Sequence, residues 1–182
     1  MSRGKKEIAD MRHILNISLI VLFLPACFEN SNKQTNMYNG LKKEALAVAE
    51  KYALSQLTLP LKNVDASGII FIGDEQKKYI IDPSKVFTGL INDDDDTDAI
   101  VTLTSFRNNY IDMIEHLIII TEEGKLLMIR SVESDMKVLT IRNGIITAKV
   151  PTYSRNSPLY NCEDCQEIKN YRYINGNLEE VK

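Results

Sequence analysis

The densest group of potential ligand side chains in this 182-residue sequence is an acidic run between residues 92 and 98. It consists of an asparagine, four consecutive aspartates, a threonine and a fifth aspartate. Calcium prefers about six to eight hard oxygen ligands, and closely spaced Asp and Asn side chains on a tight loop can supply them. Consecutive carboxylates also repel one another and stay in water. The run therefore allows either a divalent-ion site or a solvated acidic loop.

The segment from Gly89 to Val101 resembles the short calcium loops of the form GDxNxDGxxDAxV, which precede a strand in many extracellular β-rich proteins. Leu90 and Asp95 depart from that pattern, because they occupy the first ligand place and the place of the turn glycine. The resemblance implies calcium as the one cofactor to be considered. The candidate metal ligands are Asn92, Asp94, Asp96 and Asp98.

A second chemical motif is the pair of thiols at Cys162 and Cys165. The export signal described below places them in an oxidising compartment, where an even number of thiols normally pairs. A redox-active pair needs a lowered thiol pKa, and the acidic residues between the two cysteines disfavour a thiolate. A zinc site needs four ligands, whereas His116 is the one histidine beyond the signal. We therefore predict a structural disulfide.

No motif in the sequence selects an enzymatic reaction. His116 lies in a predicted strand among Ile114, Glu115 and Leu117, where a lone histidine is more often a structural residue than a base. The chain has no nucleophile elbow and no phosphate-binding glycine loop. Pairs of carboxylates could serve a glycosidase, but the many acidic residues offer accidental pairs. The sequence assigns no catalytic residue, and we lean towards a protein that is not an enzyme.

The N-terminal segment carries a targeting signal. Ile14 to Ala26 is a run of 13 almost wholly apolar residues, preceded by Lys5, Lys6 and Arg12. A membrane-spanning helix needs about 18 or more such residues, whereas the core of a signal peptide needs about 7 to 15. We therefore predict a cleaved signal peptide, translated from Met1 or from Met11.

The residues Leu24-Pro25-Ala26-Cys27 resemble the lipobox of bacterial lipoproteins. The resemblance implies cleavage before Cys27 and attachment of diacylglycerol and palmitate-like acyl chains to this residue. It also implies a location in the bacterial cell envelope, which includes the periplasm in a cell that has one, and it leaves open which face of the membrane the protein occupies. Phe28 follows the cysteine in place of the aspartate that retains lipoproteins in the inner membrane, so the outer membrane is favoured. An ordinary secretory signal that happens to precede a cysteine is the alternative.

Removal of residues 1–26 changes the charge balance of the chain. It takes away four basic and two acidic residues, which leaves 18 of the 22 basic and 23 of the 25 acidic residues, a net charge of −5. This acidic balance argues against nucleic acid as a partner. The polar stretch from Phe28 to Met37 has no helical or strand periodicity, so we interpret it as a flexible tether. The predicted organisation is a signal peptide (1–26), a lipidated tether (27–37) and one envelope domain (38–182).

The domain begins with one helical pattern and continues with strand patterns. Apolar residues at helical spacing between Leu41 and Gln56 predict an amphipathic helix that ends before Pro60. Ten short runs rich in β-branched residues follow, and Asn143-Gly144 and Asn175-Gly176 are typical of two-residue hairpins. The continuous apolar run from Leu117 to Ile120 predicts a central strand covered on both faces. The predicted fold class is α+β, with the helix packed on a largely antiparallel meander sheet.

Three classes of function follow from these patterns. The first is a noncatalytic binding or scaffold lipoprotein whose partners are the membrane, through the lipid, and an envelope protein or glycan. The second is an envelope hydrolase acting on cell wall or polysaccharide, which would require two close carboxylates in an exposed cleft. The third is a calcium-dependent binding module, which would require the oxygens of the acidic run to converge. A continuous apolar or aromatic patch without either feature would favour the first class.

Overall fold

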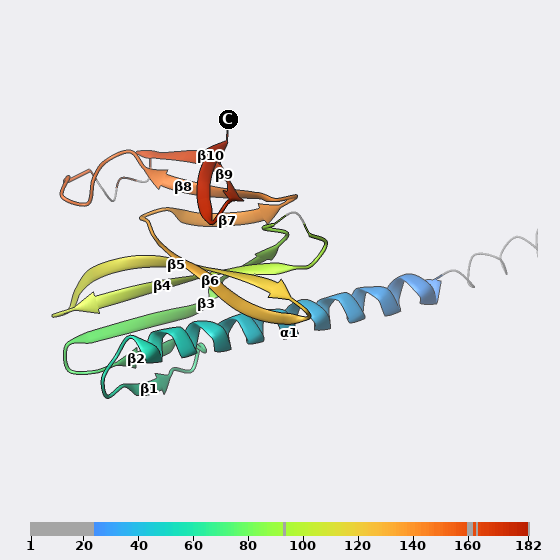
Figure 1. The fold of residues 1–182 in the computed structure, drawn as a ribbon, viewed down its shortest axis with the longest axis horizontal. Helices are drawn as coiled ribbons and strands as arrows, with labels where there is room; N and C mark the ends of the chain where they lie inside the picture. The colour runs from blue at the N-terminus through green and yellow to red at the C-terminus, as the bar shows by residue number, and fades with distance from the viewer. Residues whose placement is uncertain (1–23, 93, 160–161, 163, 182) are drawn as a thin grey trace, which may run out of the picture. The chain divides into compact units, whose positions relative to one another are not determined.

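A computed structural model describes residues 24–92, 94–159, 162 and 164–181 of the chain. The chain divides into two compact units, residues 1–39 and residues 40–182. Helix α1 (Leu24–Ser55) includes the described part of the first unit and continues into the second. The second unit contains all the strands of the described chain, and Figure 1 shows them in two layers.

The strands form two antiparallel sheets, each with its strands in sequential order. Sheet A consists of β1 (Leu61–Val64), β2 (Ile70–Gly73), β3 (Lys77–Gly89), β4 (Asp98–Arg107), β5 (Tyr110–Glu122) and β6 (Lys125–Glu133). Sheet B consists of β7 (Lys137–Arg142), β8 (Ile145–Pro151), β9 (Gln166–Ile174) and β10 (Asn177–Val181). The chain therefore completes one meander before it starts the other.

Tight turns join several neighbouring strands. Asn143 and Gly144 have φ angles of 51° and 73°, and Asn175 and Gly176 have φ angles of 49° and 83°. Two successive residues with positive φ match the right-handed twist of the flanking strands, which is why Asn-Gly is favoured there. The predicted hairpins β7–β8 and β9–β10 are confirmed.

Sheet A has an apolar core on each face. On one face, strands β2 to β6 share a buried cluster with Ala45, Ala49 and Ala53 of α1. On the other face, Ile100 and Ile118 share a second buried cluster with residues of sheet B. Three consecutive residues of β5, from Leu117 to Ile119, are fully buried. The prediction that this strand is central and covered on both faces is confirmed.

The predicted fold class is wrong. The protein is mainly β, with two antiparallel sheets rather than a helix on a single meander. The physical reason lies in strands such as β5, whose two faces are both apolar. A sheet with two apolar faces needs a covering layer on each, and one helix can supply only one. The strands after Glu133 fold into the second sheet and supply the other layer.

Individual elements also differ from their predicted bounds. Two predicted strands, one on each side of Pro83, are a single strand β3 with an irregularity in its pairing to β4 between Ile81 and Val86. Strand β1 was not predicted, because its four residues are all exposed and carry no alternation. Strand β9 begins at Gln166, five residues before the predicted run at Tyr171.

Candidate functional site

The carboxylate of Asp98 is a structural acceptor within the acidic run. Its Oδ2 accepts hydrogen bonds from the backbone N–H of Ile91 at 2.9 Å and of Asn92 at 3.4 Å. Its Oδ1 accepts from the N–H of Thr121 at 2.9 Å. Burial raises the pKa of Asp98, although these backbone N–H groups act in the opposite direction. This fully buried side chain therefore joins the loop before β4 to the end of β5.

The other described candidates of the acidic run lie nearer the surface. The amide of Asn92 donates to Oδ2 of Asp94 at 2.5 Å, and Oδ1 of Asp94 accepts from the N–H of Asp96 at 2.9 Å. Oδ1 of Asn92 is buried and has no hydrogen-bond partner among the described residues. Among all the residues that the structure describes, there is no group of three or more His, Cys, Asp or Glu side chains close enough together to hold a metal ion. The structure thus brings Asn92 and Asp94 together and directs Asp98 to backbone groups.

His116 lies in β5 and is fully buried. Its Nδ1 lies 3.0 Å from Oγ1 of Thr102, and its Nε2 lies 3.2 Å from the carbonyl oxygen of Ser134. Desolvation by burial lowers the pKa of His116 to about 4, against the opposing effect of the backbone near Ser134 and Met136. A neutral imidazole in this position links β4 and β5 to the segment that leads into sheet B.

Its chain neighbour Glu115 belongs to a polar cluster on the helix side of sheet A. Oε2 of Glu115 accepts hydrogen bonds from the hydroxyls of Tyr52 at 2.5 Å and of Ser131 at 2.7 Å. Burial raises the pKa of Tyr52 to about 12, and the hydrogen bond to Glu115 acts in the same direction. Glu115 is 4% exposed, so this cluster connects α1 to sheet A rather than offering a group to solvent.

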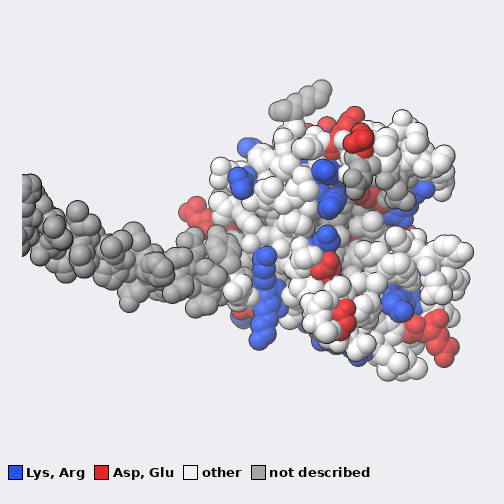
Figure 2. All heavy atoms as spheres, turned by 180° about the vertical axis from the view of Figure 1, so that it is seen from behind, with Lys and Arg blue, Asp and Glu red and all other residues white. Residues whose placement is uncertain are grey.

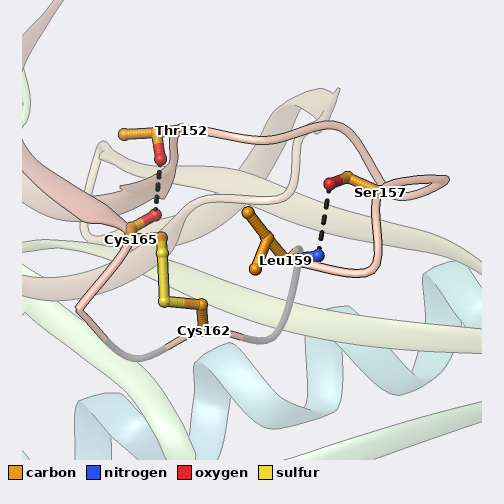
Figure 3. Close-up of a disulfide and its surroundings, with 5 residues drawn as sticks. All are labelled: Thr152, Ser157, Leu159, Cys162 and Cys165. Carbon is orange, nitrogen blue, oxygen red and sulfur yellow. Dashed lines mark hydrogen bonds between the residues drawn. A yellow bond between two sulfur atoms is a disulfide. The ribbon is translucent and has the colours of Figure 1, made fainter.

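Cys162 and Cys165 form a disulfide with a Cα–Cα distance of 5.1 Å. Figure 3 shows the bond beside Thr152, whose N–H and hydroxyl both donate to the carbonyl oxygen of Cys165, at 3.0 and 2.8 Å. Arg155 in the same segment forms an ion pair with Asp135 and donates to the carbonyl oxygen of Asp112 at 3.0 Å. The predicted disulfide therefore ties the irregular segment between β8 and β9 at its base.

The predicted signal peptide lies mostly outside the described residues. Residues 1–23 are not described, whereas residues 24–27 contribute helical backbone to α1. Residues 27–37, predicted as a tether of the mature chain, have helical backbone in the same element. Among the described residues, no helix is long and apolar enough to cross a membrane. Lipidation of Cys27 and the tether stay predictions.

Sheet A has one face that packs against α1 and an opposite face that packs against sheet B. Part of this opposite face makes no contact with the core that sheet B shares. The strand register places two rows of cross-strand neighbours there. The first row is Asn63, Phe71, Ile80, Thr104 and Ile114, and the second is Leu61, Gly73, Lys78, Phe106 and Ile111. We call these ten residues the open face. None of them belongs to a buried core cluster, and Leu61 and Ile111 are 82% and 55% exposed.

The open face is hollowed. Two adjoining hollows, of about 520 and 1240 Å³, share lining residues that include Phe71 and Lys78. Ile80 and Phe106 line the first, and Leu61 and Gly73 line the second. Because glycine has no side chain, the second row has a gap between Leu61 and Lys78. The result is a depression across β1 to β4 in which apolar side chains such as Phe71 lie beside polar and charged residues of the β2–β3 turn.

Two carboxylates lie in the hairpin turn at the rim of the hollows, and one is already engaged. Asp74 accepts from the backbone N–H of Gln76 and of Lys77, each at 2.9 Å, and these bonds lower its pKa. Glu75 and Lys78 are exposed and form no ion pair or hydrogen bond among the described residues. Within the described part of the chain, the side chains of Glu75 and Lys78 are therefore exposed charges without an ion-pair partner.

The surface as a whole has no field of a single sign on the side seen in Figure 2. Lys and Arg side chains are interspersed there with Asp and Glu, and uncharged residues separate them. A mixed surface of this kind gives no broad steering towards a polyanion such as nucleic acid.

Sequence reasoning did not find the open face. Its signal was present in the run Gly68 to Ile72, which is apolar at both even and odd positions. Ile70 and Ile72 face the helix-side core, so Phe71 must face the other way. Only the register shows that Phe71, Ile80 and Phe106 lie on the same face, because their strands are joined by turns of different lengths.

Comparison with known proteins adds no relative. No protein-family model, curated protein or solved structure matches this chain.

Proposed function

We propose that this protein is a lipid-anchored lipoprotein of the bacterial cell envelope, with a noncatalytic binding or scaffold role carried by the open face. The observation that supports binding is the hollowed open face with its exposed apolar residues, none of which belongs to either buried core cluster. Contiguous exposed apolar surface of this kind typically marks an interaction site. The support for the anchor is the lipobox that ends at Cys27.

The anchor is tested by Cys27→Ser. Each buried methylene contributes about 0.8 kcal/mol, so two or three acyl chains hold a protein that one chain holds only reversibly. We expect the variant to leave the membrane fraction while its melting temperature in detergent stays close to that of the parent. A membrane-bound variant, or a natural protein whose leading cysteine carries no acyl group, contradicts the proposed anchor.

The binding role is tested by photo-crosslinking in intact cells. A photoreactive amino acid at Phe106 is expected to give a discrete adduct, because this side chain lines the hollow. The matched control is the same amino acid at Glu179, an exposed residue on β10 of the other sheet. Equal patterns at the two positions would contradict binding through the open face.

A calcium-dependent binding module is the second candidate, and one observation favours it. Oδ1 of Asn92 is a buried oxygen without a hydrogen-bond partner among the described residues, and it lies beside Asp94. A bound cation would satisfy such an oxygen. Thermal unfolding with calcium and with chelator tests the idea. A calcium site predicts a higher midpoint in calcium, whereas identical midpoints remove this candidate.

A further inference from the structure

We propose that the outer edge of strand β1, on the side away from β2, binds an extended peptide segment of a partner protein as an added antiparallel strand. The inference goes beyond the open face, because the surface is the edge of sheet A and the partner is recognised by its backbone. Strand β1 ends the strand order of sheet A, and among the described strands only β2 pairs with it (Figure 1). All four residues of β1 are exposed.

The hydrogen-bond pattern shows which main-chain groups of β1 face outward. The N–H of Asp65 donates to the carbonyl oxygen of Ile69 at 3.0 Å, which closes the β1–β2 hairpin. In an antiparallel pair, residues that exchange main-chain bonds alternate with residues that do not. Asn63, two positions before Asp65, is therefore the next residue that bonds to β2. The N–H and C=O groups of Lys62 and Val64 point away from β2, and within the described chain they have no other hydrogen-bond partner.

These outward groups select a peptide backbone as the ligand. Lys62 and Val64 each present one donor and one acceptor, and the set repeats every two residues, about 6.8 Å along a strand. An extended peptide carries the same donors and acceptors at the same spacing, and this pairing supplies the affinity in β-strand addition. Leu61 and Val64 are 82% and 49% exposed, whereas the ammonium group of Lys62 pairs with Glu50. We therefore expect a partner segment that is rich in apolar residues.

The other three edge strands that the structure describes are protected. The edge of β7 lies against the end of β3, because a Cβ on Gly89 would lie 2.8 Å from the carbonyl oxygen of Ile141. Strand β10 carries two consecutive glutamates, of which Glu180 pairs with Lys169, and charged side chains on an edge disfavour further pairing. The pairing of β6 with β5 is irregular, and bulges bend an edge away from partners. Strand β1 pairs with β2 without irregularity, so its edge is the best suited to accept a strand.

Proline substitution tests whether the outward groups of β1 lie as inferred. Val64→Pro removes an N–H that points away from β2, and proline is tolerated at such edge positions. Its melting temperature should therefore stay close to that of the parent. Asn63→Pro removes an N–H that bonds to β2, so its melting temperature should be lower. Equal losses in the two variants would place the N–H of Val64 in the β1–β2 ladder and overturn the inference.

Binding is measured with a displayed library of random linear peptides, selected on the full-length protein in detergent. We expect Val64→Pro to raise the dissociation constants of enriched peptides at least about tenfold, and Val64→Thr, which keeps the N–H, to leave them within about twofold. A bound peptide should also slow amide hydrogen exchange at Lys62 and Val64 and leave exchange at Asn63 unchanged. A selection that enriches no peptide, or peptides that bind the parent and Val64→Pro equally, overturns the inference.

Modified peptides distinguish backbone pairing from binding by side chains alone. Only every second N–H of an added strand faces β1. N-methylation of alternate residues of an enriched peptide should therefore abolish binding in one phase and preserve it in the other. Equal effects of the two phases contradict strand addition. This proposal and the proposed binding role can fail separately, because the Phe106 adduct reports on the open face and Val64→Pro reports on the edge.

Discussion

The polar side chains that this protein buries act as connectors between strands. Asp98 joins the loop before β4 to β5, and His116 joins β4 and β5 to the segment before β7. Glu115 joins α1 to β5 and β6. A buried polar group is costly unless its hydrogen bonds are made, and each of these three makes bonds to separate elements. Residues whose types suggested chemistry are thus used to hold the fold.

Asp98→Asn should destabilise the protein strongly. The amide nitrogen of Asn would face backbone N–H groups that now donate to a carboxylate oxygen, so at least one buried donor loses its acceptor. We expect the free energy of unfolding to fall by about 3 kcal/mol. Urea unfolding measures the change, with exposed Asp96→Asn as the control, expected within about 0.5 kcal/mol of the parent. Equal effects of the two substitutions would contradict the structural role of Asp98.

His116 should make stability depend on pH. Its pKa is about 4 in the folded protein, against 6.5 in an unfolded chain. Between these values the unfolded chain binds a proton that the folded protein does not, so stability falls as the pH drops from 6.5 towards 4. The full effect is about 3 kcal/mol, and above pH 6.5 it is absent.

The measurement is the melting midpoint against pH for the parent and for His116→Asn. Carboxylates titrate in both proteins, so the difference between the two curves isolates the histidine. We expect the variant to be less stable at pH 7 and to have the flatter profile between pH 6.5 and pH 4. Parallel curves would show that the imidazole is not buried in its neutral form.

At the scale of elements, close approach between strands of the two sheets depends on a glycine. A Cβ added at Gly89, the last residue of β3, would lie 2.8 Å from the carbonyl oxygen of Ile141 in β7. That distance is too short for carbon and oxygen, and the obstacle is backbone, so β3 and β7 would have to separate. The end of β3 therefore sets the spacing of the sheets at this point.

Gly89→Ala should lower the free energy of unfolding by about 1–3 kcal/mol, the usual cost of overpacking. Gly40→Ala is the matched control, since a Cβ there meets no atom within 4 Å. In a helix alanine is favoured over glycine by about 1 kcal/mol, so this control should be neutral or stabilising. Denaturant unfolding of both variants distinguishes crowding at Gly89 from a general effect of replacing glycine.

The disulfide should act locally. A loop closed by residues three apart removes little chain entropy, so Cys162→Ser with Cys165→Ser should cost about 2 kcal/mol or less. We expect the main effect on the segment between β8 and β9, measured as faster hydrogen exchange and faster proteolysis there. The pairing of β7 to β10 does not involve the two cysteines, so we expect sheet B to retain its protection. Loss of protection throughout sheet B would contradict this local role.

At the scale of the whole molecule, α1 and sheet B cover different faces of sheet A. One face of sheet A is covered by the alanines of α1, and part of the other is covered by sheet B. Sheet B, with fewer strands, covers only part of this second face, and the open face lies outside the covered part. The candidate binding surface is therefore a consequence of sheets of six and four strands rather than of any one motif.

Local patterns determined much of this protein without reference to tertiary structure. Turns such as Asn143-Gly144, the central strand around Ile118 and the thiol pair follow from preferences that act over a few residues: positive φ, side-chain period and proximity in the chain. The predicted targeting segment is also a local feature, because a lipobox is defined by four consecutive residues and not by tertiary contacts. These properties need no knowledge of distant contacts.

Only the tertiary structure decided the fold class, the role of Asp98 and the open face. Each depends on residues that are far apart in the sequence, such as Asp98 with Thr121, or Phe71 with Phe106. An aspartate in an acidic run has the same local pattern whether it points to a metal ion or to a backbone N–H group. Likewise, a strand that is apolar on both faces shows that two covering layers are needed, but not how far each layer extends. Register and the relative size of the sheets settle that extent, because they determine which apolar side chains stay uncovered.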